Sequence, residues 1–130
     1  MPSTLTPLLS LIGRILLALM FVLAGPGKLT NAAGTAAFMG SVGLPASAGL
    51  AMATGLFELV AGAALIIGFK ARWAALALAG FTVVASFLFH AFWALPAEQQ
   101  MMQHLMFLKN IAVAGGLLLL AAHGPGAWSM

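Results

Sequence analysis

The sequence predicts an all-α membrane protein, a bundle of four transmembrane helices with a short interfacial helix between helices 1 and 2. Composition is the first reason: 63% of the 130 residues are hydrophobic and only 5% are charged, whereas charged residues make up roughly a quarter of soluble domains. The second reason is that four apolar segments approach the roughly 20 residues that a helix needs to cross a bilayer. The solvent around most of this chain is therefore expected to be lipid.

Proline and glycine divide these segments. Gly25-Pro26-Gly27 is expected to end the first span, Pro45 to precede the second, Pro96 to stop the third, and Gly124-Pro125-Gly126 to end the fourth. The predicted spans cover about 8–24, 46–69, 73–95 and 105–122, within a single domain over 1–130.

The predicted connections differ in kind. Residues 28–44 are too long for a simple loop and carry apolar residues among small ones, which favours a short helix lying at the interface. Residues 70–72 form a tight turn between the second and third spans, and the polar stretch 96–104 forms an exposed loop. Basic residues favour the cytoplasmic side. Arg14, Lys70 and Arg72 therefore predict that both termini are cytoplasmic, with Lys28 on the other side.

Several classes of function lack support. The chain has no cysteine, which excludes disulfides, thiolate metal sites and a dithiol redox step on this chain. Its net charge of +3 comes from only five basic side chains, three of them in or beside apolar runs, so no basic patch for nucleic acid is expected. A cleaved signal peptide is not expected either, since a basic start is missing and Arg14 interrupts the first apolar run.

Glu58 is an acidic residue near the middle of the second span. A charge at that depth is costly and by default indicates a functional site. Ala51, Gly55, Glu58 and Gly62 follow at steps of four, three and four residues, so they share one helix face. Small residues allow a second helix to approach closely, and we therefore expect Glu58 to face protein rather than lipid.

Arg14 is the expected partner of Glu58, because the predicted topology brings the two residues to similar depths. A bidentate arginine–carboxylate pair would satisfy both charges away from water. In one interpretation the pair only fixes the register of helices 1 and 2. In the other, Glu58 and Arg14 are catalytic: Glu58 accepts a proton or a quinol hydroxyl, and Arg14 adjusts its acidity.

A second polar group is expected nearer the outer side. Thr82, Ser86 and His90 follow at steps of four, although serine and threonine in membrane helices often bond only to their own backbone. His90, Lys109 and Asn110 could form a polar pocket beside Trp93, with Lys28 above it. Donors beside an apolar slot suit a quinone head group, so these five residues are the predicted cofactor-binding residues.

Other interpretations of this pocket stay open. Haem could be held between His90 and His104, and copper(I) by Met101, Met102 and Met106 around His104, because soft thioethers suit that ion; no metal site is predicted. Equally, His90 and Lys109 could simply extend to the interface and bond to loops.

The chain resembles a known family along nearly its whole length. The matching motifs, in order, are Gly13-Arg14, Gly25-Pro26-Gly27-Lys28-Leu29, Gly34 to Phe38, Gly43-Leu44-Pro45, Glu58 with Gly62, Phe107-Leu108-Lys109-Asn110, Gly115-Gly116 and Gly124-Pro125-Gly126. Together they resemble the DoxX (DoxD-like) family of small membrane proteins.

The resemblance implies a four-helix, multi-pass protein of the bacterial or archaeal inner membrane. Members are linked to redox chemistry, as subunits of thiosulfate:quinone oxidoreductases or as membrane partners of enzymes that detoxify thiols and superoxide. Carried onto this chain, the residues implied are Arg14, Lys28, Glu58, His90, Lys109 and Asn110.

The expected function is that of a redox-associated integral membrane protein that interacts with quinone, as a subunit of an oxidoreductase or a membrane partner for one. A homo-oligomer or a hetero-complex with a redox enzyme is expected. One alternative is a non-catalytic scaffold that docks soluble detoxifying enzymes through the 70–72 turn and the two termini. Another is a small oligomeric transporter, because 130 residues are few for a transport path in one copy.

Overall fold

The structure, a computed structural model, describes residues 5–41, 43, 47–89 and 96–126. These residues form five helices: α1 (Leu5–Thr30), α2 (Ala32–Ser41), α3 (Ala48–Ile67), α4 (Ala71–Phe89) and α5 (Ala97–His123). All but α2 are long and apolar enough to cross a membrane. The predicted fold class is confirmed, with four candidate spans and a short helix between the first two.

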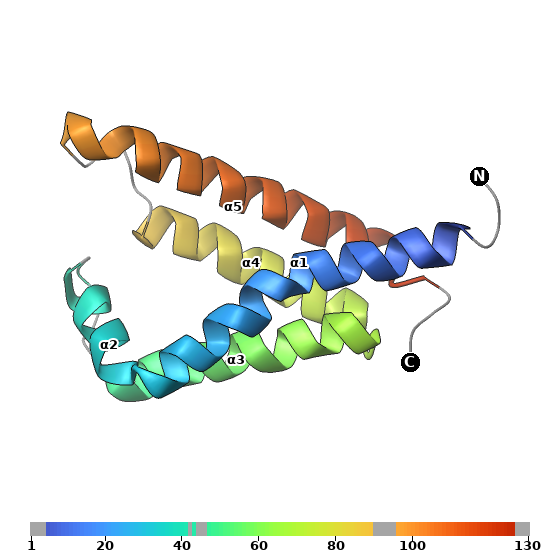
Figure 1. The fold of residues 1–130 in the computed structure, drawn as a ribbon, viewed down its shortest axis with the longest axis horizontal. Helices are drawn as coiled ribbons and strands as arrows, with labels where there is room; N and C mark the ends of the chain where they lie inside the picture. Colours follow the sequence, from blue (N-terminus) through green and yellow to red (C-terminus); the bar gives the residue numbers. More distant parts are fainter. Residues whose placement is uncertain (1–4, 42, 44–46, 90–95, 127–130) are drawn as a thin grey trace.

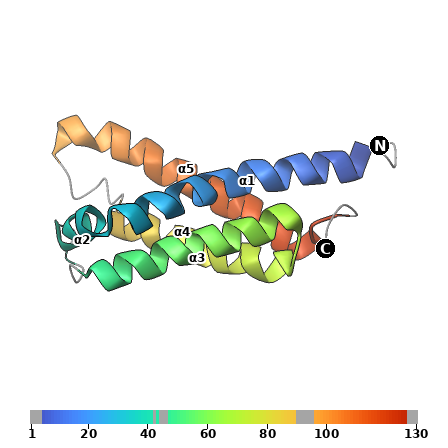
Figure 2. The same ribbon diagram turned by 60° about the horizontal axis from the view of Figure 1, so that its bottom comes forward.

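The four long helices pack as two antiparallel pairs, α1 with α3 and α4 with α5 (Figure 1). α1 begins and α5 ends at the same end of the bundle, where the two pairs lie closest. Toward the opposite end, which carries α2, the pairs diverge in the view of Figure 1. In the turned view of Figure 2, α4 overlaps α1 and α3 at this end, and the start of α5 stands apart from them. The bundle is therefore closed at one end and spread at the other.

Small residues bring α1 and α3 together. A Cβ atom added to Gly55 would lie 2.8 Å from the Lys28 Cβ and 2.9 Å from the Gly25 carbonyl oxygen, and one added to Gly62 would lie 2.9 Å from Val22. The predicted small-residue face of the second span is confirmed, because Ala51, Gly55, Glu58 and Gly62 are all buried.

The closed end holds the apolar core. Its buried members come from all four long helices: Ala18, Phe21, Ala61, Leu65, Ala71, Ala75, Leu78, Ala79 and Leu117. Many other leucines point outward, among them Leu16, Leu23 and Leu119, each at least 64% exposed. An exposed apolar surface of this kind is what a lipid environment requires of a membrane helix.

Two helix boundaries differ clearly from the prediction. α1 does not stop at Gly25-Pro26-Gly27 but continues to Thr30. Proline is tolerated in membrane helices when neighbouring helices and Ser or Thr side chains satisfy the backbone. Here the Thr30 hydroxyl donates to the Pro26 carbonyl at 2.9 Å, and Gly25 packs against the backbone of Gly55.

α5 begins at Ala97, so the predicted exposed loop over 96–104 is wrong. Glutamate, glutamine and methionine, which fill this stretch, are good helix formers, and a helix can continue beyond the hydrocarbon layer. α4 is described as far as Phe89, and the remainder of the predicted third span, 90–95, lies outside the described residues. The predicted tight turn before α4 is present but lies at residues 68–70 rather than 70–72, because α4 already starts at Ala71.

Candidate ligand-binding cavity

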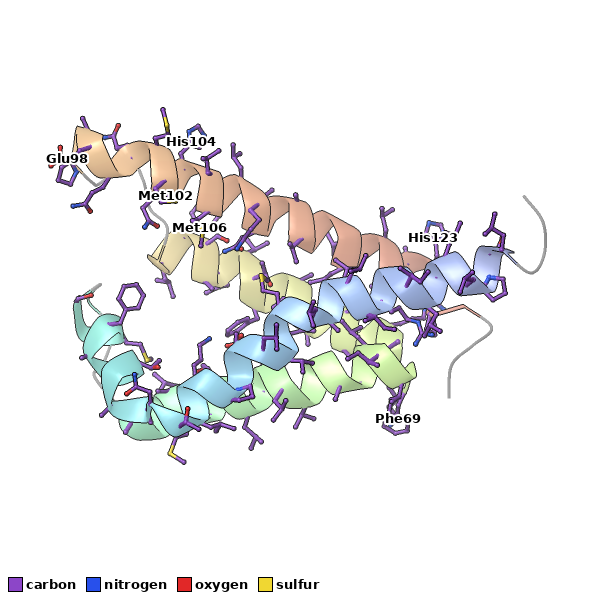
Figure 3. The ribbon with its side chains drawn as sticks, in the orientation of Figure 1. Phe69, Glu98, Met102, His104, Met106 and His123 are labelled. Atoms are coloured by element: carbon purple, nitrogen blue, oxygen red, sulfur yellow. The ribbon has the colours of Figure 1, made fainter. Side chains whose placement is uncertain are left out.

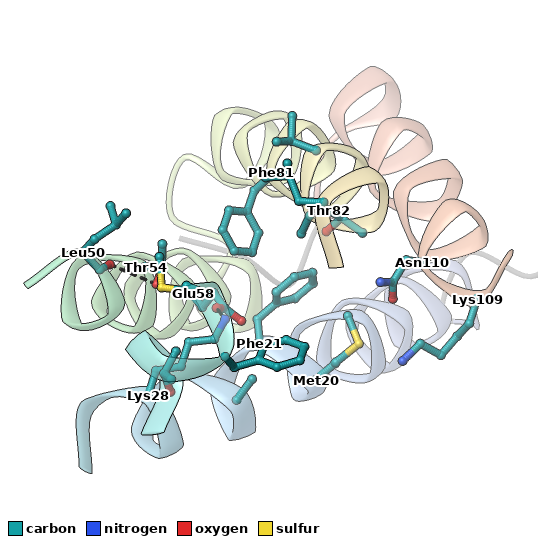
Figure 4. Close-up of a pocket in the computed structure, with 17 residues that line it drawn as sticks. Met20, Phe21, Lys28, Leu50, Thr54, Glu58, Phe81, Thr82, Lys109 and Asn110 are labelled. Atoms are coloured by element: carbon teal, nitrogen blue, oxygen red, sulfur yellow. Dashed lines mark hydrogen bonds and ion pairs between the residues drawn. The ribbon is translucent and has the colours of Figure 1, made fainter. Parts of the chain in front are cut away.

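A cavity of about 450 Å³ lies between the two helix pairs, in the half of the bundle where they diverge. Side chains from all five helices line it (Figure 4): Met20, Phe21, Ala24, Lys28, Thr35, Phe38, Met39, Leu50, Thr54, Glu58, Phe81, Thr82, Val84, Ala85, Leu88, Lys109 and Asn110. Most of these are apolar or aromatic. The polar groups stand on opposite walls, with Lys28 and Glu58 on one and Asn110 and Lys109 on the other.

Lys28 and Glu58 form an ion pair on the wall made by α1 and α3. The Glu58 side chain is 5% exposed and that of Lys28 is 29% exposed. The Lys28 amine also lies 5.5 Å from the centre of the Phe81 ring on α4, within the range of a cation–π contact. The extension of α1 through Pro26 is what brings Lys28 to this wall, because the same helix carries it past Gly55.

Arg14 lies elsewhere, and the predicted Arg14–Glu58 ion pair is wrong. The Arg14 Nη1 donates to the carbonyl oxygens of Leu65 at 3.0 Å and Ile66 at 2.9 Å, in the last turn of α3. Leu65 follows Glu58 by seven residues, about 10 Å along a helix. The last carbonyls of a helix have no partner within it and carry partial negative charge. Arg14 therefore joins α1 to the C-terminus of α3.

Arg72 binds a second helix end in the same part of the bundle. Its Nε donates to the Ala121 carbonyl at 2.9 Å and its Nη2 to the Ala122 carbonyl at 2.5 Å. Ser10 adds a hydrogen bond from its hydroxyl to the Pro125 carbonyl at 3.0 Å. At the closed end, side chains therefore join neighbouring segments by donating hydrogen bonds to backbone carbonyls.

The opposite wall presents polar groups with unused hydrogen-bonding capacity. Thr82 is 3% exposed, and its hydroxyl has no hydrogen-bond partner among the described residues. One turn along α4, the Ser86 hydroxyl donates to the Thr82 carbonyl at 2.8 Å, the local bond expected of serine in a membrane helix. Asn110 is 8% exposed and points its amide toward the cavity (Figure 4).

The structure brings together three of the five predicted cofactor-binding residues, Lys28, Lys109 and Asn110, and places Glu58 with them. The other two, His90 and Trp93, lie outside the described residues. His104 is exposed on α5 and does not line the cavity (Figure 3). Within the described ranges, no three residues of the types His, Cys, Asp and Glu are close enough to hold a metal ion.

Sequence reasoning missed other parts of the cavity wall. Thr35, Phe38 and Met39 of α2 contribute to it, although α2 was expected only to lie at the interface. Phe21 and Lys28 are seven residues apart and so share one face of α1, a signal that was available once the helix was known to continue past Pro26.

The arrangement suits a compact ring with polar substituents. Ligand pockets in proteins are mostly apolar, with a few polar groups that fix orientation. Here the Lys28 and Lys109 amines and the Asn110 amide can donate, the Thr82 hydroxyl can donate or accept, and the Glu58 carboxylate accepts. A ligand in the cavity would meet these groups from two sides.

Comparison with known proteins identifies the family. The DoxX family model matches residues 9–91. Inner membrane protein YqjF of Escherichia coli is 42% identical over 92% of this chain and 87% of its own length. Inner membrane protein YphA of the same organism is 32% identical over 95% of this chain and 89% of its own length.

A more distant match is the Surfeit locus protein 4 homolog of Schizosaccharomyces pombe, 34% identical over 58% of this chain and 26% of that protein. No solved structure matches. With four candidate membrane spans and inner membrane proteins as relatives, this chain is an integral membrane protein that belongs to the DoxX family.

Proposed function

We propose that this protein is a redox-associated membrane subunit whose cavity binds a quinone. The ring would lie between the α1–α3 and α4–α5 pairs, with its oxygens toward the polar walls. The centre that transfers electrons is assigned to a partner protein, because this chain has no cysteine for a dithiol step or a thiolate-bound cluster of its own.

The main support is the buried Thr82 hydroxyl, which lines the cavity and has no hydrogen-bond partner among the described residues. Buried polar groups in proteins nearly always have a partner, and one without a partner is destabilising. Asn110 lines the same cavity and is also buried. A quinone oxygen between these two groups would satisfy both of them.

The ion pair on the opposite wall gives the site a second role. Quinol carries hydroxyl hydrogens where quinone carries only acceptor oxygens. Glu58 would accept a hydrogen bond from quinol, and Lys28 would donate one to quinone. The site therefore contains a partner for either redox form, and the pair can rearrange locally as one form replaces the other.

We also infer that α1 begins and α5 ends on the cytoplasmic side. Arg14, Lys70 and Arg72 all lie at that end of the bundle, and basic residues are enriched on the cytoplasmic side of inner membrane proteins. The cavity would then lie nearer the outer side of the membrane, within reach of the lipid-dissolved quinone pool.

The experiment is a binding titration of the purified protein, in mild detergent, with short-chain ubiquinone and menaquinone analogues. The unsubstituted protein is expected to bind at least one of them saturably. Thr82→Val, which keeps the shape of the side chain but removes its hydroxyl, is expected to weaken binding about tenfold, as for the loss of one buried hydrogen bond.

Ser86→Ala is the matched control, since it removes a buried hydroxyl one turn away on the same helix that already bonds to the Thr82 carbonyl. Its binding constant is expected to match that of the unsubstituted protein. Melting temperature separates binding from folding, because Thr82→Val removes no described hydrogen bond and should leave the melting temperature unchanged or raise it. Equal binding by Thr82→Val and Ser86→Ala would count against this site, and no saturable binding of either analogue would end the quinone proposal.

A further inference from the structure

The cavity contains one positive charge more than its side chains can balance, and Lys109 carries it. We propose that Lys109 selects a ligand with an anionic group, so that the preferred occupant is an acidic, ionised quinone rather than a neutral one. This proposal rests on the proposed function, because it specifies the chemical class of the ligand at the same site.

Lys109 lies in the first part of the apolar portion of α5. The polar stretch over residues 97–104 precedes that portion, so Lys109 is about 6 Å beyond its first residue, Leu105, at 1.5 Å per residue. An ammonium group at such a depth is costly unless it pairs with another charge or faces a polar cavity. Lys109 lines the cavity, and Figure 4 shows its amine on the side that faces α1.

The chain has no side-chain carboxylate to offer Lys109. Its two acidic residues are Glu58 and Glu98, and Glu58 is paired with Lys28. Glu98 precedes Lys109 by eleven residues on the same helix, about 16 Å along its axis, and lies at the far end of α5 (Figure 3). Among the described residues, Lys109 has no ion pair.

The charges that line the cavity are those of Lys28, Glu58 and Lys109. The first two neutralise each other, which leaves the charge of Lys109. Asn110 follows it directly in the sequence, is buried and lines the same cavity. An ammonium and an amide that line the same cavity are hydrogen-bond donors suited to an anionic oxygen. The apolar walls require the rest of the ligand to be apolar, and together these features describe an ionised hydroxyquinone.

Two closely matched ligands test this inference. 2-Hydroxy-1,4-naphthoquinone is ionised at neutral pH, whereas 2-methoxy-1,4-naphthoquinone has the same rings and no charge. Binding of each is titrated with the purified protein in a neutral detergent at pH 7. The unsubstituted protein is expected to bind the ionised compound about tenfold more tightly, because charge-assisted hydrogen bonds are roughly twice as strong as neutral ones.

The ratio of the dissociation constants of the two compounds is then measured for three variants. Partition of the compounds into detergent affects this ratio equally for every protein, so differences between proteins report binding alone. Lys109→Met is expected to bring the ratio close to one, and Lys109→Arg to keep it. Lys70→Met is the control, because it removes a positive charge from the exposed α3–α4 turn, away from the cavity. Its ratio should equal that of the unsubstituted protein.

The outcomes separate the two proposals. Equal binding of both compounds to the unsubstituted protein, or a preference for the ionised one that survives Lys109→Met, would overturn the anion preference and leave quinone binding standing. Saturable binding of neither naphthoquinone would count against the proposed function itself. Melting temperatures of Lys109→Met and Lys109→Arg test whether each variant is folded. If Lys109→Met does not fold, Lys109→Gln replaces it. The proposal then predicts that Lys109→Arg keeps the preference for the ionised compound and that Lys109→Gln loses it.

Discussion

The Lys28 ammonium binds the Glu58 carboxylate across the α1–α3 interface, between the last turns of one helix and the middle of the other. This contact unites two features that are unusual inside a membrane, a carboxylate and a helix that continues through Gly25-Pro26-Gly27. The same glycine-lined crossing that lets α1 approach α3 also brings Lys28 to the cavity wall. Helix packing and the chemistry of the site therefore depend on one contact.

Removal of one member of this pair should destabilise the protein more than removal of both. Lys28→Met leaves the buried Glu58 without its counter-ion, and we expect a loss of roughly 2–3 kcal/mol, less than for a fully buried pair because Lys28 is 29% exposed. The double variant Lys28→Met/Glu58→Leu should regain most of that loss. Denaturation in detergent measures all three, and a double variant less stable than Lys28→Met would contradict the assignment.

The close contact of α1 and α3 at Gly25 and Gly55 leaves no room for a larger side chain. Gly55→Ala would place a methyl group 2.8 Å from the Lys28 Cβ, and overpacking of this kind typically costs about 1–3 kcal/mol. Gly115→Ala is the control, because an added Cβ there meets nothing within 4 Å and alanine favours helix by up to about 1 kcal/mol. The stability of Gly115→Ala should equal or exceed that of the unsubstituted protein. Equal melting temperatures for the two variants would argue against this crossing.

Arg14 should matter for folding rather than for ligand binding. Arg14→Met removes the bonds to the Leu65 and Ile66 carbonyls, and we expect a loss of about 2 kcal/mol, as for hydrogen bonds from a charged group. Quinone affinity of the folded variant should stay within about twofold, because Arg14 does not line the cavity. Arg72→Met, whose bonds lie at an exposed helix end, should lose less stability. A large loss of affinity in folded Arg14→Met would place Arg14 in the site after all.

The proposed orientation can be measured directly, since the chain has no cysteine and a single introduced one gives no background. A membrane-impermeant maleimide applied to spheroplasts should label a cysteine introduced by Gln99→Cys. It should label one introduced by Lys70→Cys only after the membrane is opened, because the α3–α4 turn is assigned to the cytoplasm. The reverse pattern would invert the topology.

Local sequence spacing was enough to predict how α3 packs. The face formed by Ala51, Gly55, Glu58 and Gly62 follows from helix periodicity alone, and every member is buried. The residues that gather at the cavity, Lys28, Glu58, Lys109 and Asn110, were found because polar side chains in a membrane helix have few other uses. Each of these two inferences needs only the type of a residue and its position within an apolar helix, and neither needs to know which distant segment that residue contacts.

Contacts between distant segments could not be obtained in that way. Arg14 was expected to meet Glu58 because their depths matched, but depth along a helix does not fix which neighbour a side chain reaches, and the unpaired carbonyls at the end of α3 bind Arg14 instead. The predicted helix end at residues 25–27 and the predicted loop over residues 96–104 are wrong for another reason. Proline and polar residues end an apolar run, but the backbone can remain helical where packing or water satisfies its polar groups.

Photolabelling tests the claim that quinone binds in this cavity most directly. The purified protein is irradiated with an azido-substituted quinone, with and without excess unlabelled quinone, and the labelled peptides are sequenced. Competable label is expected on cavity residues such as Phe38, Met39 and Leu88. Label confined to lipid-facing residues such as Leu16 and Leu119, or label that excess quinone does not displace, would contradict the claim.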